Sequence, residues 1–358
     1  MALDGWKEKI YQRYLAWVCR PARIKRHMHA FLPSPKQPAK PEPGHKKNQV
    51  RAAALQVELK LLKNPLQFAD EMHRRVREAV NEEAELIVFP EYNNLPLFGL
   101  LPGFEKMEEA YREKAQNAGT GQDHEQEGEI GLADVFRYMS PVVQPLVHTV
   151  FSCLSAAYGV HIMAGSYTLA EKGNVINRSF LYGPGGLLIG SQDKVHLLPV
   201  EVEWRLKRGG SFSVFDTPLG KMAMPVCMDA TYYETFRILE QKGADIVLLP
   251  IANLEDYNYW LALRGIWPRV QESCLYGIKG ALVGSIAGLA FTGRAGIFAP
   301  LEITPKKDGV LAQVEPCSSE AIAVADLDIE VLHGLRRNHP WRDTNPALYR
   351  RYLPELYN

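Results

Sequence analysis

A cysteine stands where an apolar, strand-like run gives way to a helical segment. Residues 220–226 are mostly apolar and stop at Cys227, and residues 231–241 then have the composition and spacing of a helix. Such a junction lifts the sulfur out of the sheet, and N–H groups of the helix N-terminus favour a thiolate and, later, an oxyanion. Because a lone cysteine among apolar residues is more often a small buried hydrophobe, Cys227 needs partners before it indicates chemistry.

Two other side chains that suit acid–base chemistry follow strand-like runs in the same way. Residues 86–90 lead directly into Glu91, and residues 187–192 lead to Lys194. Taken singly, a carboxylate at such a point is commonly an N-cap or loop residue, and a lysine is commonly solvated. Together with Cys227 they make a complete set of base, cation and nucleophile.

This set of residue types needs no metal and no cofactor. A thiol with its usual pKa of ~8.5 is mostly protonated at neutral pH. It therefore needs a base, here Glu91, or a cation that stabilises the thiolate, here Lys194. The ammonium and the N–H of Met228 would hold the oxygen of a tetrahedral intermediate. Glu91 would protonate departing ammonia and then activate water against the thioester. We expect the neighbouring His196 to be structural.

The three motifs, taken in order, resemble those of one enzyme family. Phe-Pro-Glu at 89–91, Lys-x-His-Leu at 194–197 and Cys-x-Asp at 227–229 are similar to the nitrilase superfamily of carbon–nitrogen hydrolases. The likeness extends from about Val50 to about Tyr357. It implies an α/β protein with the four-layer αββα sandwich of the nitrilase type. It also implies that the motif Glu, Lys and Cys are a catalytic triad.

The superfamily has an auxiliary glutamate, for which this sequence offers two candidates. The resemblance places it shortly before the Gly209 region, where Glu201 and Glu203 compete. We favour Glu203, which directly precedes Trp204.

The residues around the nucleophile indicate a branch of the superfamily. Members that hydrolyse nitriles usually have Cys-Trp-Glu, whereas residues 227–229 are Cys-Met-Asp, closer to the Cys-Tyr-Asp of amidases and carbamoylases. The arginine-rich signature of carbamoyl-amino-acid hydrolases is not recognisable further on. We expect Tyr92, Tyr232 and Tyr233 to line an aromatic, uncharged pocket, with Met228 also contacting substrate.

The prediction is a hydrolase that cleaves a small linear amide through a cysteine thioester and releases ammonia. Three alternatives stay open. The substrate could be a nitrile or an N-carbamoyl compound. The thioester could pass to an amine or thiol, which would make the protein an acyltransferase. The chain could also be an inactive scaffold or membrane-docking protein.

Composition narrows the setting. The 358 residues include 41 Lys and Arg and 41 Asp and Glu, so the formal net charge is zero. A net positive charge that would attract nucleic acid is therefore absent from the sequence. The five cysteines are scattered without metal-site spacing, which favours a reduced compartment. No run approaches the ~18 apolar residues of a membrane span, and the N-terminus lacks the features of a signal peptide. We expect a cytoplasmic protein.

The N-terminal residues differ from the rest. Residues 1–48 form a basic arm with a proline-rich linker, ahead of a hydrolase domain at 49–358. Within the arm, residues 4–20 are predicted to be a helix with an apolar stripe of Trp6, Ile10, Tyr14 and Val18, which Tyr11 and Leu15 widen. This arm is expected to pack on its own domain or a partner subunit, or else to lie on an anionic membrane.

Two more segments carry expectations about partners. The tail at residues 336–357 resembles the superfamily's C-terminal arm, which commonly crosses a dimer interface, so we expect a homodimer or a higher homo-oligomer. The acidic insertion at residues 102–134 is either a lid or a solvated loop.

Overall fold

The computed structural model describes residues 5–34, 49–104, 106, 108–109, 132–263, 265–286, 288–339 and 345–357. The proline-rich linker and most of the acidic insertion lie outside the described residues. The helices are α1 (Gly5–Val18), α2 (Pro21–His29), α3 (Pro65–Asn81), α5 (Leu132–Tyr158), α6 (Pro199–Glu203), α7 (Tyr233–Gln241), α8 (Tyr259–Leu263), α9 (Ile266–Ser273), α10 (Ile329–Asn338) and α11 (Pro346–Leu356). Three 3₁₀ helices are η1 (Leu95–Leu100), η2 (Cys227–Thr231) and η3 (Leu301–Ile303).

The strands form one 13-stranded sheet with the order β5-β4-β3-β2-β1-β9-β8-β7-β6, to which β10, β11, β12 and β13 are attached. They are β1 (Gln49–Glu58), β2 (Leu86–Val88), β3 (His161–Glu171), β4 (Asn174–Tyr182), β5 (Leu188–Asp193), β6 (Val214–Thr217), β7 (Gly220–Ala223), β8 (Ile246–Ile251), β9 (Tyr276–Ile286), β10 (Leu289–Phe291), β11 (Gly296–Phe298), β12 (Val310–Gln313) and β13 (Ala321–Asp328).

The strands β3, β2, β1, β9, β8 and β7 are each parallel to the next. The antiparallel pairs β3–β4 and β4–β5 bring β5 back to the direction of β3. The carboxyl ends of β2, β5, β7 and β8 therefore meet at the same edge of the sheet. In open α/β sheets this edge is where ligands bind.

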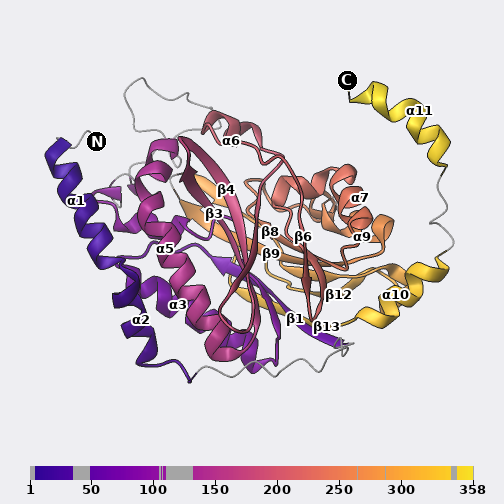
Figure 1. Ribbon diagram of the computed structural model, residues 1–358, viewed down its shortest axis with the longest axis horizontal. Helices are drawn as coiled ribbons and strands as arrows, with labels where there is room; N and C mark the ends of the chain where they lie inside the picture. Colours follow the sequence, from indigo (N-terminus) through magenta and orange to yellow (C-terminus); the bar gives the residue numbers. More distant parts are fainter. Residues whose placement is uncertain are drawn as a thin grey trace.

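Helices cover the nearly closed sheet on two sides. Figure 1 shows α3 and α5, with α1 and α2 outside them, on one side of the strands, and α7, α9 and α10 on the other. Each side has its own apolar core against the strands. The layering is thus helix, sheet, sheet, helix, as the resemblance to the nitrilase superfamily implies.

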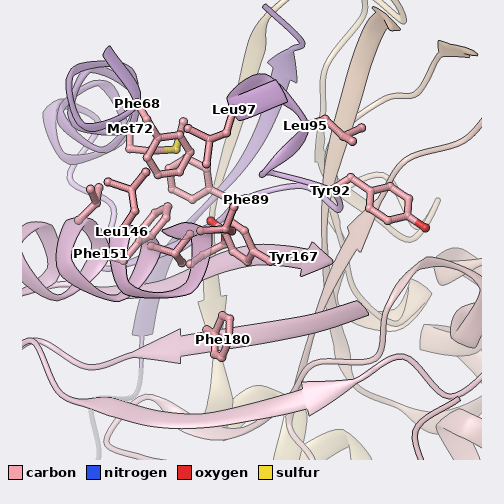
Figure 2. Packing of buried hydrophobic residues seen from close by; sticks show 14 of the residues in the cluster. Phe68, Met72, Phe89, Tyr92, Leu95, Leu97, Leu146, Phe151, Tyr167 and Phe180 are labelled. Carbon is pink, nitrogen blue, oxygen red and sulfur yellow. The ribbon is translucent and has the colours of Figure 1, made fainter. Parts of the chain in front are cut away.

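Local sequence explains where α3 begins and what it buries. Asn64 caps the helix through its side chain, which accepts hydrogen bonds from two backbone N–H groups, and Pro65 occupies the first turn. Phe68 and Met72, one turn apart, point towards α5, where the Phe68 and Phe151 rings lie 6.5 Å apart (Figure 2). The buried residues of α3 recur at helical spacing and so lie on one face.

The apolar stripe predicted for the first helix is buried along one side only. Trp6, Ile10 and Tyr14 are 63%, 56% and 51% exposed, whereas Leu15 and Val18 are buried. The helix has apolar residues on two faces, and packing against α5 selects only one of them. With Trp17, which is also exposed, the outward face leaves four large apolar side chains in contact with solvent.

The second helix fixes the N-terminal segment to the body of the molecule. Ile24 and Met28 of α2 have no exposed surface, and α2 packs against α3 and α5. By contrast, no residue of α11 is buried, and this helix stands apart from the layers in Figure 1. Within the described ranges, no helix has the length and apolar character needed to cross a bilayer.

Candidate active site

The three motif residues follow strands that end at the same edge of the sheet. Glu91 comes after β2, Lys194 immediately follows β5, and Cys227 opens η2 shortly beyond β7. The predicted placement of these side chains at strand ends therefore holds in the structure. Neither β5 nor β7 is a neighbour of β2 in the sheet order, so the residues come together because the nearly closed sheet folds back on itself.

Glu91 and Lys194 form a fully buried ion pair. The Nζ atom of Lys194 lies 2.8 Å from Oε1 of Glu91, and neither side chain has exposed surface. Nδ2 of Asn177 on β4 donates a second hydrogen bond of 2.8 Å to the same oxygen. The other carboxylate oxygen, Oε2, is buried and has no hydrogen-bond partner among the described residues. A base with one oxygen held and one oxygen available is suited to accepting a proton.

A second carboxylate binds the same lysine, and it is Glu201. Its Oε1 lies 2.7 Å from Nζ of Lys194 and also accepts a hydrogen bond from the hydroxyl of Tyr92. Its Oε2 accepts a hydrogen bond of 2.7 Å from the backbone N–H of Leu198. Every oxygen of Glu201 is thus engaged in orienting the site.

Our preference for Glu203 as the auxiliary acid is therefore wrong, because Glu201 is the residue that contacts Lys194. Both residues belong to the short helix α6, but Glu201 is completely buried and Glu203 is exposed. Two positions along a helix differ in direction by about 200°, so only one of the pair can face Lys194. Glu201 is also the third residue of α6, from which its side chain reaches back to the residue that caps the helix.

Cys227 adopts a backbone conformation that is rare for a residue with a side chain. Its φ is +45°, in the left-handed region, at the first residue of η2. The thiol is half-buried, and Sγ lies 3.8 Å from Oδ1 of Asn253, which follows β8. Such strained positions cluster at functional sites, where the surrounding structure holds them in place.

The electrostatics of the cluster favour a resting thiol. Burial raises the pKa of Glu91 to about 7; the charge of Lys194 counteracts this rise, and the Glu201 carboxylate adds to it. Burial, followed by the charge of Glu91, raises the pKa of the Cys227 thiol well above its usual value in spite of Lys194. For Lys194 burial disfavours the ammonium, but the neighbouring carboxylates outweigh it and its pKa is raised. Two carboxylates share one cation, so the cluster disfavours a standing thiolate on Cys227.

A cavity of about 340 Å³ opens beside the nucleophile. Its lining includes Cys227, Met228 and Asn253 together with residues of α8, α9 and β9. This volume is in the range of small-molecule sites. The expected uncharged, aromatic lining is wrong, because Glu255 and Lys279 are also in the wall.

Of the residues predicted to bind substrate, Met228 lines this cavity and the tyrosines do not. Tyr92 is buried beside Lys194, with Nζ 5.9 Å from its ring, where its hydroxyl orients Glu201. Tyr232 is 39% exposed and stacks on the ring of His196 at 4.2 Å. The sequence showed that these side chains lie near the motifs but could not show which way they point.

Comparison with known proteins gives the family. Residues 51–270, more than half of the chain, match the family model described as carbon-nitrogen hydrolase. The chain belongs to the carbon–nitrogen hydrolase family.

Curated relatives of this carbon–nitrogen hydrolase carry several names. It is 26% identical to the probable hydrolase YhcX of Bacillus subtilis over 81% of this chain, but it spans only 52% of that relative. It is 28% identical to a nitrilase of Pyrococcus abyssi, with 81% of this chain and 94% of the relative covered. The omega-amidase NIT2 of Danio rerio is 24% identical, with 82% and 93% covered.

Solved structures confirm the fold. The amidase from Nesterenkonia sp. AN1, in the form of a double mutant in complex with acrylamide, superposes with a TM-score of 0.59. The match covers 86% of this chain and 98% of that one at 18% sequence identity. The predicted four-layer αββα sandwich of the nitrilase superfamily is therefore correct.

Sequence reasoning did not anticipate what Asp229 does in this hydrolase. Its buried carboxylate accepts hydrogen bonds from the backbone N–H groups of Val226 at 2.8 Å and His196 at 2.7 Å, and from Nδ1 of His196 at 2.9 Å. It thus joins the loop that carries Lys194 to the turn that carries Cys227. The Cys-x-Asp spacing was the available signal. In the part of the chain that is described, no group of three His, Cys, Asp or Glu side chains has the arrangement of a metal site.

Proposed function

We propose that this chain hydrolyses a small linear amide through a thioester on Cys227 and releases ammonia. The observation that carries this proposal is the convergence of Glu91, Lys194 and Cys227 in one cluster beside a cavity of substrate size. The names of the relatives, which include amidases, support the reaction class. The Cys-Met-Asp sequence at 227–229 favours an amide over a nitrile.

In the proposed mechanism, each group has a task. Glu91 accepts the thiol proton as sulfur attacks the amide carbonyl, which forms the C–S bond. Lys194 and the N–H of Met228 stabilise the negative oxygen of the tetrahedral intermediate. Glu91 returns the proton to the leaving nitrogen, and the C–N bond breaks to give ammonia and a thioester. Water, deprotonated by Glu91, then releases the acid and restores the thiol.

A substrate panel tests the reaction class. Short amides, nitriles and N-carbamoyl compounds are assayed for ammonia release, with amides expected first. Cys227→Ala is expected to abolish release while circular dichroism stays unchanged, and Cys153→Ala, a substitution of another half-buried cysteine, is the matched control. Faster turnover of nitriles would overturn the choice of substrate, and a folded, active Cys227→Ala protein would overturn the choice of nucleophile.

Mass spectrometry of the intact protein separates hydrolysis from acyl transfer. A thioester on Cys227 that water resolves supports the hydrolase. A thioester that persists until an amine or a thiol is added would identify an acyltransferase. An inactive scaffold would show neither the adduct nor ammonia release.

We also propose that the protein is a cytoplasmic homo-oligomer that uses its C-terminal helix as an arm. Support comes from α11, in which Leu348, Tyr349, Tyr352 and Leu356 are exposed. An apolar helix face without cover in the subunit is suited to pack against a second copy.

A further inference from the structure

A buried lysine that takes no part in the proposed mechanism lines the same cavity as the nucleophile. Lys279 lies on β9 between β1 and β8, with 4% of its surface exposed, and faces the cavity beside Cys227. Lysine is rarely buried without a partner, because removing its charge from water is costly. Its presence in a central strand therefore requires an explanation.

No carboxylate in the described ranges forms an ion pair with Lys279. Its Nζ lies over the ring of Phe298, 5.3 Å from the ring centroid. Burial, and then the positive charge of nearby Arg294, lower the pKa of Lys279 to about 8, and no acid counteracts the shift. At neutral pH this lysine remains mostly protonated. The cavity wall thus holds a positive charge that the described protein groups leave uncompensated.

A second cation with unused hydrogen-bonding capacity lies close by. The guanidinium of Arg294 stacks over the ring of Tyr257 at 4.8 Å. Nε of Arg294 and the hydroxyl of Tyr257 are both buried and have no hydrogen-bond partner among the described residues. Tyr257 also lines the cavity. Buried polar atoms without partners commonly mark a place that a ligand or water completes.

The acids of the cavity are placed differently. Glu255 and Asp256 also belong to the lining, but both are exposed to solvent. Charges in water are screened, whereas a charge in a buried wall acts at nearly full strength on a ligand beside it. The buried end of the cavity is therefore positive, even though its rim carries two carboxylates.

We propose that Lys279, supported by Arg294 and Tyr257, forms an anion-binding subsite in the cavity of Cys227. Its ligand is the carboxylate of an amide substrate, at the end remote from the bond that is cleaved. This inference rests on the proposed amide hydrolysis and narrows its substrate class. The carboxylate supplies the missing negative charge and accepts charge-assisted hydrogen bonds. The preferred substrates are monoamides of short dicarboxylic acids.

The test compares two substrates of equal length in the full-length protein. One is the monoamide of a four-carbon dicarboxylic acid and the other is pentanamide, which lacks the charge. The unmodified enzyme is expected to have the higher kcat/KM for the monoamide. Lys279→Met, which keeps the length of the side chain, should reduce this selectivity ratio at least about tenfold, mainly through KM, because a hydrogen bond to a charged group is lost. Lys221→Met, a change of a partly exposed lysine on β7, is the control that keeps the ratio.

Other outcomes would overturn the subsite. An unchanged ratio in Lys279→Met, or a preference of the unmodified enzyme for pentanamide or a cationic amide, would show that Lys279 does not recognise substrate charge. If Lys279→Met does not fold, competitive inhibition of the unmodified enzyme tests the subsite instead. Succinate, which carries the negative charge, should then inhibit far more strongly than its neutral diamide. Equal inhibition would contradict the proposal.

Failure of the proposed function is distinguishable from failure of the subsite. Calorimetric binding of succinate to the Cys227→Ala protein needs no turnover. Binding that Lys279→Met abolishes supports the subsite even if no amide is hydrolysed. Ammonia release from neutral amides without any succinate binding would support the proposed hydrolysis and contradict the proposed anion-binding subsite.

Discussion

At the scale of single residues, the site depends on two carboxylates that share one lysine. Glu91 and Glu201 both bind Lys194 through Oε1, at 2.8 and 2.7 Å. The net charge of the cluster is negative and buried, which keeps the Cys227 sulfur protonated at rest. In the proposed mechanism, the nucleophile therefore forms only when Glu91 takes the proton.

The pH profile should report the unusual Glu91. The base works only when it is deprotonated, and its pKa is raised to about 7. We therefore expect kcat/KM for a neutral amide to rise with pH through the neutral range and not near the usual pKa of Glu, ~4.3. A rate that is already constant above pH 5.5 would contradict this assignment. Glu91→Gln should lose nearly all ammonia release at every pH.

Exchanging the auxiliary acid for its amide should move that profile. The charge of Glu201 contributes to the raised pKa of Glu91, so Glu201→Gln should shift the rising limb to lower pH. The lost charge-assisted hydrogen bonds should also cost roughly 1–3 kcal/mol of stability. Glu203→Gln, an exposed change in the same helix, is the control for both the kinetic profile and urea unfolding. If the two substitutions had equal effects, the assignment of Glu201 as the auxiliary acid would be contradicted.

At the scale of secondary-structure elements, the N-terminal helices are part of the body in which the site is held. Helix α2 buries Ile24 and Met28 against α3 and α5. These helices share one apolar core with the residues that lead to Glu91. The exposed face of α1, with Trp6, Ile10 and Tyr14, remains available for another contact. Attachment of this face to an anionic membrane stays a prediction.

Two isoleucines of the N-terminal segment give a direct test of this packing. Ile24→Ala removes a completely buried side chain and should lower the free energy of unfolding by roughly 2–5 kcal/mol. Ile10→Ala removes a side chain that is 56% exposed and should change it by less than about 0.5 kcal/mol. Urea unfolding followed by circular dichroism measures both. Similar losses for the two variants would mean that α2 does not dock as described.

At the scale of the whole molecule, the active site and the proposed assembly surface are separate. The site lies where parallel strands end, whereas α11 stands apart from the layers (Figure 1). Assembly through α11 therefore need not alter the chemistry.

Charged substitutions in α11 should dissociate the oligomer without stopping turnover. The double change Leu348→Asp and Tyr352→Asp places two charges in the exposed apolar face. Light scattering after gel filtration should then give a lower mass than that of the unmodified protein. Leu187→Asp, at a residue that is 76% exposed in the β4–β5 hairpin, controls for a surface charge elsewhere. An unchanged mass in the double variant would rule out α11 as the assembly surface.

The sequence by itself located the three motif residues at the ends of strands, because the signals that specify these positions are local. Strand-like runs that end at Glu91, Lys194 and Cys227 can be recognised from neighbouring residues, and so can the apolar face of α3. The family resemblance then supplied the order of the layers. The strand ends and the apolar face of α3 depend on periodicity or short spacing, which tertiary contacts leave intact.

Only the tertiary structure decided questions that depend on direction and on many charges at once. Glu201 and Glu203 are equivalent in sequence, and the orientation of α6 towards Lys194 selects the first. The two apolar faces of α1 satisfy the same spacing rule, and α5 covers just one. Lys279 carries no local signal, since its significance arises from a cavity that distant segments form. The raised pKa of Cys227 likewise depends on burial and neighbouring charges that exist only when these segments have come together.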